Sequence, residues 1–198
     1  MKPQILRPMT QSRSAAPSRG SRAQFERRVN QLPDETRSRL AKGELQSADA
    51  AFYVVKAVSG SRSQKMLRDD DNKVVGISNL SSGKLEKGSY FLLDGITLLA
   101  GVAGEGDTIH DVNFNVIPDF MRNGQFELSA NNTTIIDGAS LELFNTTGQN
   151  VAVGHYTLDN PKMIDEQKAI ELNLEWGADA PVGTFIKAIL RGSVVTKA

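Results

Sequence analysis

The chain contains no cysteine, one tryptophan and two histidines, and each of these shortages argues against a class of function. Without cysteine there are no disulfides, no thiolate nucleophile and no cysteine-ligated zinc. His110 and His155 alone offer little material for a histidine-rich metal centre or a catalytic triad. No run approaches the roughly 18 apolar residues of a membrane span, and no apolar secretory-signal core is visible near the amino terminus. What remains bears on architecture and assembly more than on catalysis.

The net charge of zero conceals an uneven distribution of charge along the chain. Residues 1–43 carry ten basic and three acidic side chains, whereas residues 74–198 carry eight basic and fifteen acidic ones. Such an asymmetry is typical of a basic arm attached to an acidic globular body. We therefore predict two parts, a basic N-terminal arm over residues 1–43 and a body over residues 44–198.

The arm combines a segment of low apolar content with two short helix signals. Residues 1–20 contain three prolines and few apolar side chains, so in isolation we expect them to be disordered. Phe25, Val29 and Leu32 then recur at helical spacing behind a serine–glutamine capping box. A second helix is predicted over residues 34–42, between a proline and a glycine. Both helices are too short to be stable alone and need a docking surface, for which a neighbouring subunit is the candidate.

From residue 52 the hydrophobic period changes from helical to two, which is typical of β-strands with one buried face. Residues 170–176 show this most clearly, because isoleucine, leucine and tryptophan alternate there with glutamate and asparagine. Strands are predicted over residues 52–58, 73–79, 90–93, 96–99, 108–117, 125–130, 133–136, 141–144, 151–157, 169–176 and 184–195. The predicted turns contain glycine, asparagine or proline and include residues 94–95, 137–138 and 160–161.

So many short strands without alternating helices argue for an antiparallel sandwich or barrel and against a parallel sheet. Inside the body only residues 118–123 look helical, and only for a turn or two. A jelly roll suits both the number of strands and the size of the body. We therefore predict an all-β fold, an antiparallel β-sandwich of jelly-roll type, preceded by an extended N-terminal arm with one or two short helices.

Two segments look like ligand sites but are better explained as loops. Residues 69–72 are three aspartates and an asparagine, whose oxygens suit calcium, yet the spacing of an EF-hand fails at Lys73. Residues 101–107 contain three glycines, but a phosphate-binding loop needs a following helix, and a strand is predicted there. We predict a solvated hairpin loop and a strand-linking loop, with no metal site and no cofactor.

Catalytic motifs are missing, so no enzyme and no catalytic residue is predicted. His110 adjoins Asp111, but no Gly-x-Ser-x-Gly elbow marks a serine as a nucleophile. Trp176 is in phase with the apolar side of its strand, so we expect it in the core rather than stacked on a sugar ring.

The basic arm is the segment with an evident interaction mechanism. Its cations can neutralise nucleic-acid phosphates, and its apolar stripe beside arginines can lie on an anionic membrane. Its arginines can equally meet acidic faces of neighbouring bodies, and a solvated tail is the remaining alternative. The candidate assembly residues are Arg7, Arg13, Arg19, Arg22, Phe25, Arg27, Arg28, Val29 and Leu32.

A basic arm, a compact β-sandwich and the lack of a catalytic motif together resemble the layout of single jelly-roll capsid proteins of tailless bacteriophages. The resemblance implies a structural virion protein that assembles into a shell in the host cytoplasm, with its arm reaching neighbouring subunits or the particle interior. The implied partners are copies of itself and other virion proteins, with the genome or an internal membrane met through the arm, and no small-molecule substrate. The alternative is a carbohydrate- or receptor-binding β-sandwich module of a phage fibre or adhesin. A cupin-like enzyme is a third interpretation, which two histidines disfavour.

Overall fold

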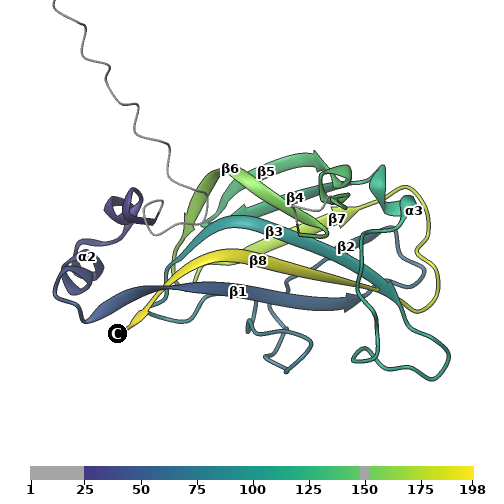
Figure 1. The fold of residues 1–198 in the computed structure, drawn as a ribbon, viewed down its shortest axis with the longest axis horizontal. Helices are drawn as coiled ribbons and strands as arrows, with labels where there is room; N and C mark the ends of the chain where they lie inside the picture. The colour runs from purple at the N-terminus through teal and green to yellow at the C-terminus, as the bar shows by residue number, and fades with distance from the viewer. Residues whose placement is uncertain (1–24, 148–151) are drawn as a thin grey trace, which may run out of the picture.

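The computed structural model describes residues 25–147 and 152–198, which form two four-stranded antiparallel sheets packed face to face (Figure 1). Sheet A has the strand order β1-β8-β3-β6, and sheet B has the order β2-β7-β4-β5. The strands are β1 Leu45–Ala57, β2 Ser63–Lys65, β3 Phe91–Val102, β4 Gln125–Ala130, β5 Thr133–Ser140, β6 His155–Ile164, β7 Ile170–Glu175 and β8 Thr184–Lys197. The predicted all-β antiparallel sandwich is confirmed.

The core lies between the two sheets, because each strand turns alternate side chains toward the facing sheet. On β7 the buried residues are Ile170, Leu172 and Leu174, as their alternation with polar neighbours predicted. Trp176 follows them with only 5% of its surface exposed, and its indole Nε1 donates a hydrogen bond to the carbonyl oxygen of Ser61 at 3.0 Å. The prediction that Trp176 belongs to the core is therefore confirmed.

The C-terminal strand β8 is the centre of sheet A. It pairs with β1 along the whole of that strand, from Leu45 opposite Lys197 to Ala57 opposite Phe185, and it pairs with β3 on its other side. At Gly192 of β8, an added Cβ would overlap the carbonyl oxygen of Leu92 on β3. Glycine is therefore the residue that this pairing accommodates.

The helical segments are short. They are η1 Val29–Gln31, α2 Asp34–Ala41, α3 Asp119–Arg122 and η2 Leu141–Phe144. The second predicted arm helix is confirmed as α2, with Gly43 just after it at a φ of 75°. The first prediction is wrong in extent, because η1 is a single 3-10 turn rather than a helix continuous to Leu32. Its capping box lies outside the described residues.

Three predicted turns are wrong, because each lies inside a strand. Residues 94–95 belong to β3 and residues 137–138 to β5, and at both places the register shifts by a β-bulge. A bulge takes up the extra residue, and Gly138 adopts its φ of 57° there without strain. Residues 160–161 belong to β6, the edge strand of sheet A, where Pro161 interrupts no inner ladder.

Three predicted strands are also wrong. Residues 73–79 and 108–117 form only isolated bridges, and residues 141–144 form the 3-10 helix η2. The segment 108–117 lies across the outer face of sheet A, where a Cβ added at Gly101 would touch Val112 and Asn113. One side of this segment faces the sheet and the other faces solvent, which produces strand-like alternation without continuous pairing.

Gly192→Ala is expected to lower the free energy of unfolding by about 1–3 kcal/mol, because the added Cβ overlaps the backbone of Leu92. Urea unfolding followed by circular dichroism measures the change. Gly177→Ala is the matched control, since no atom lies within 4 Å of its added Cβ, and its effect should stay within about 0.5 kcal/mol. Equal stabilities of the two variants would contradict the account of the β3–β8 approach.

Candidate functional site

The described part of the arm packs on the outer face of sheet A. Leu92 and Met163 point to this face, because their neighbours Phe91 and Ile164 point into the core. In Figure 1, α2 lies at the end of the sandwich where β1 begins and β8 ends. We call the buried cluster formed there the N-terminal contact; its members are Phe25, Leu32, Leu45, Tyr90, Leu92, Met163 and Val195.

The apolar stripe of the predicted assembly residues is buried within the subunit. Phe25 and Leu32 are each 3% exposed, and Val29 is half-buried against the same cluster. The docking surface that these short helical segments need is thus present on the body of the same chain. These contacts do not bear on whether residues 44–198 fold alone, so the division of the chain at residue 43 stays a prediction.

The two predicted assembly arginines that the structure describes, Arg27 and Arg28, differ in their surroundings. Arg28 Nη2 donates a hydrogen bond to Oδ1 of Asn160 on β6 at 2.8 Å, whereas Arg27 is exposed. Arg28 therefore ties the arm to the edge of sheet A, and Arg27 keeps its charge at the surface. The other predicted assembly arginines lie outside the described residues and are Arg7, Arg13, Arg19 and Arg22.

Four ionisable side chains, one from each strand of sheet A, meet on its outer face. Asp49 of β1, Asp94 of β3, His155 of β6 and Arg191 of β8 line one shallow hollow. Burial raises the pKa of Asp94, a hydrogen bond from its own backbone opposes this rise, and Asp49 adds to it. Burial, helped by Arg191, lowers the pKa of His155, whose Nδ1 lies 3.0 Å from Oγ1 of Thr97.

Reasoning from the sequence missed this cluster. Its four members come from four strands that are distant in the chain, and no spacing pattern connects them. The register of sheet A brings them together, with Arg191 opposite Ala51 on one side and Gly95 on the other. The hollow thus combines two carboxylates, an imidazole and a guanidinium on one face of sheet A.

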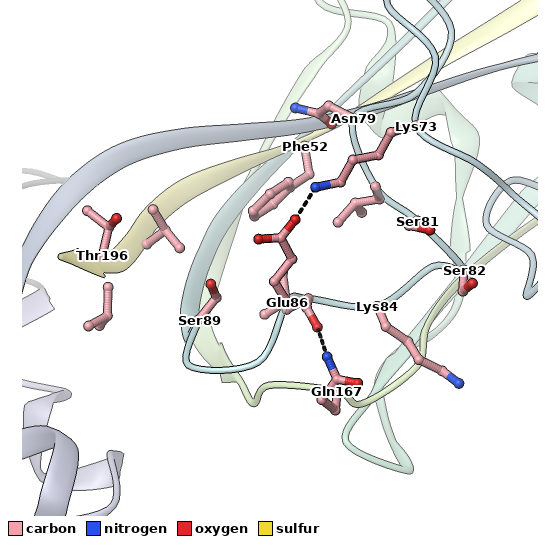
Figure 2. Close-up of a pocket in the computed structure, with 14 residues that line it drawn as sticks. Phe52, Lys73, Asn79, Ser81, Ser82, Lys84, Glu86, Ser89, Gln167 and Thr196 are labelled. Atoms are coloured by element: carbon pink, nitrogen blue, oxygen red, sulfur yellow. Dashed lines mark hydrogen bonds and ion pairs between the residues drawn. The ribbon is translucent and has the colours of Figure 1, made fainter.

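A separate pocket of about 530 Å³ opens beside β1 (Figure 2). Lys73 and Glu86 form an ion pair across it, and their hydrogen bond lowers the pKa of Glu86. Gln167 Nε2 donates to the carbonyl oxygen of Leu85 at 2.9 Å, and Phe52 contributes apolar surface. Glu86 neutralises Lys73, and Lys84 also lines the pocket, so its walls combine charged, hydrogen-bonding and apolar groups.

The acidic run at residues 69–72 is a loop, as predicted, but it joins no hairpin, because residues 73–79 form only isolated bridges. Asp71 forms an ion pair with Lys56 and accepts a hydrogen bond from the backbone nitrogen of Arg68 at 2.9 Å. Asp69 and Asp70 are exposed. Throughout residues 25–147 and 152–198, no three His, Cys, Asp or Glu side chains gather in a way that could hold a metal ion.

The glycine-rich segment after β3 is also a loop. Asp107 Oδ2 accepts a hydrogen bond from the backbone nitrogen of Gly104 at 2.8 Å. Asp111 accepts from both the nitrogen and the hydroxyl of Thr108, and these bonds lower the pKa of Asp111. Because these bonds join residues three apart, Asp111 stabilises a turn. The neighbouring His110 is exposed.

No family model, curated protein or solved structure matches the chain. Among the described residues, no helix combines the length and the apolar character that crossing a membrane requires. The features that bear on function are therefore the fold, the N-terminal contact and the distribution of charge.

Phe25→Ala is expected to lower the free energy of unfolding by about 3 kcal/mol, because it empties the centre of the N-terminal contact. Val75→Ala, at a side chain that is 92% exposed, is the control and should change stability by less than about 0.5 kcal/mol. Urea unfolding of the full chain measures both. A Phe25→Ala variant as stable as the control would show that residues 25–43 do not depend on this contact.

Lowering the pH from about 7.5 to about 5.5 is expected to destabilise the folded chain through His155. Its pKa is lowered in the folded state, so the unfolded state binds the proton more readily and gains population as the pH falls through the ordinary value of 6.5. His155→Gln should therefore lose less stability over this interval than the unaltered chain. His110→Gln, at an exposed histidine, is the control. Identical pH dependence of the two variants would contradict the prediction.

Proposed function

We propose that this chain is a structural virion protein, a capsid shell subunit with a jelly-roll body that self-assembles with the help of its N-terminal arm. The observation that carries the proposal is the strand order of the two sheets, taken together with the cationic segment in front of them. The chain belongs, on this proposal, to the virion, and its partners are copies of itself and other virion proteins.

The pairing of the strands supports a jelly roll. β1 pairs with β8, β2 with β7, β3 with β6 and β4 with β5, all of them antiparallel. This nesting is what results when one long hairpin of eight strands wraps into two sheets, as in the jelly rolls of viral shells and lectins. The four strand pairs and the strand orders of the two sheets agree with that topology.

The charge distribution supports assembly through the arm. Residues 1–24 carry five basic and no acidic side chains, and they precede a body with a surplus of carboxylates. Because Phe25 is held in the N-terminal contact, this segment starts from the same point on every subunit. Complementary charges on one chain favour correct register and rapid encounter between copies more than raw affinity.

The carbohydrate-binding alternative gains no support from the described surface. Such modules present exposed aromatic rings to stack on sugars, but none of the twelve aromatic side chains, all within the described residues, is exposed. Glycan-array binding by the chain would nevertheless promote this alternative over a shell subunit.

Deletion of residues 1–24 is expected to leave a folded subunit that no longer forms particles. The cut precedes Phe25 and so preserves the N-terminal contact, while it removes five cations. Sedimentation velocity distinguishes particles of the full chain from a slowly sedimenting truncated subunit, and circular dichroism confirms its fold. Particles of unchanged size from the truncated chain would overturn the role of the arm.

Two full-length variants separate charge from chain length in this experiment. Substituting Arg7, Arg13, Arg19 and Arg22 by Gln should weaken assembly as the deletion does, and the difference from the unaltered chain should shrink at high salt, which screens the charges. Substituting the same four residues by Lys keeps the charge and should preserve assembly. Equal behaviour of the two variants would show that the cations are not what the arm contributes.

A further inference from the structure

A groove crosses the outer face of sheet A beside the N-terminal contact. Its first part, of about 590 Å³, is lined by Phe25 and Glu26 on one side and by Ser47 and Asp49 of β1 on the other. Its second part, of about 460 Å³, is the hollow that contains the ionisable cluster described above. Asp49 lines both parts, so they adjoin each other, and we call them together the sheet A groove.

The floor of the sheet A groove includes several small side chains beside the longer ones of Asp49 and Arg191. Ser47 and Ala51 of β1 and Gly192 and Ser193 of β8 line it, and none of them has a side chain longer than two heavy atoms. An extended backbone can therefore approach the sheet closely along this line. Bulkier elements cover the face on either side, with α2 at one end and residues 108–117 at the other.

Two carboxylates of the groove, those of Asp49 and Asp94, have no ion-pair partner within the described part of the chain. Arg191 lies near enough to lower the pKa of Asp94, but burial and Asp49 outweigh it and leave that pKa raised. A further cation placed in the groove would relieve this unfavourable environment.

The chain itself has such cations at the edge of the groove. Phe25 lines the groove, and Arg22 is three residues before it, a separation that spans at most about 10 Å. Asp94 follows Leu92, a partner of Phe25 in the N-terminal contact, by two residues, which is about 7 Å along β3. Arg22 and, with a longer reach, Arg19 can therefore contact the carboxylates without any rearrangement of the described fold.

We propose that residues 17–24 occupy the sheet A groove of their own subunit, with Arg19 and Arg22 against Asp49 and Asp94. The occupant is the same chain because connectivity already places Phe25 at the edge of the groove. With residues 17–24 bound in this groove, residues 1–16 are left for contacts with other molecules. The proposal concerns the single subunit and holds whether or not subunits form shells.

The absence of cysteine makes a disulfide test clean. In the full chain, Ala23→Cys combined with Ala51→Cys places one thiol in the proposed occupant and one at the groove, where Ala51 is exposed. With oxidised glutathione at low protein concentration, we expect a disulfide within one chain, detected as loss of two hydrogens from the mass of the monomer. Disulfide-linked dimers, or thiols that stay reduced, would overturn the proposal.

Two controls keep the test specific. Ala23→Cys with Thr134→Cys, an exposed position on β5 of the other sheet, should cross-link far more slowly, and equal rates for the two pairs would refute a defined seat. Asp49→Asn and Asp94→Asn together should slow the groove cross-link about threefold, as expected for partly exposed ion pairs, whereas Asp137→Asn on β5 should not. Ala23→Cys with Ser47→Cys replaces the first pair if that variant does not fold. The cross-link is measured on unassembled chains, so its result does not depend on the proposal of a shell.

Discussion

The insertion of β8 between β1 and β3 is the contact on which the rest of the molecule depends. Without it β1 is cut off from the β3–β6 ladder, because β8 is the strand of sheet A that joins β1 to β3. Val195 near the end of this strand is completely buried and also completes the N-terminal contact. The last strand of the chain thus supports both the sandwich and the surface on which its beginning docks.

This arrangement limits what the arm can contribute to the proposed assembly. Phe25 and Leu32 are used inside the subunit, so the apolar stripe is not available to a neighbour or to a membrane unless it leaves the N-terminal contact. With residues 17–24 in the sheet A groove, as proposed, what remains for other molecules is residues 1–16, which carry three cations. Interactions made by such a segment are screened by salt and act mainly on register and encounter, which suits the proposed shell subunit.

Much of the sandwich could be predicted from the sequence, and the failures have physical causes. Alternation located the strands at residues 125–130, 169–176 and 184–195, because one face of each is buried. The aspartate–glycine pairs at residues 94–95 and 137–138 predicted turns wrongly, because a β-bulge tolerates the same residues as a turn. Local patterns carry no information on whether a glycine ends a strand or only bends it.

The site was less predictable than the fold. The stripe of Phe25, Val29 and Leu32 was visible from its spacing, but its partner Leu92 looked like an ordinary strand residue, so docking within the chain could not be distinguished from docking on a neighbour. Electron cryo-microscopy of the purified full-length chain tests the central claim most directly. The account predicts closed particles of uniform diameter whose wall is built from these sandwiches. Isolated subunits over the whole accessible range of concentration and salt would contradict it.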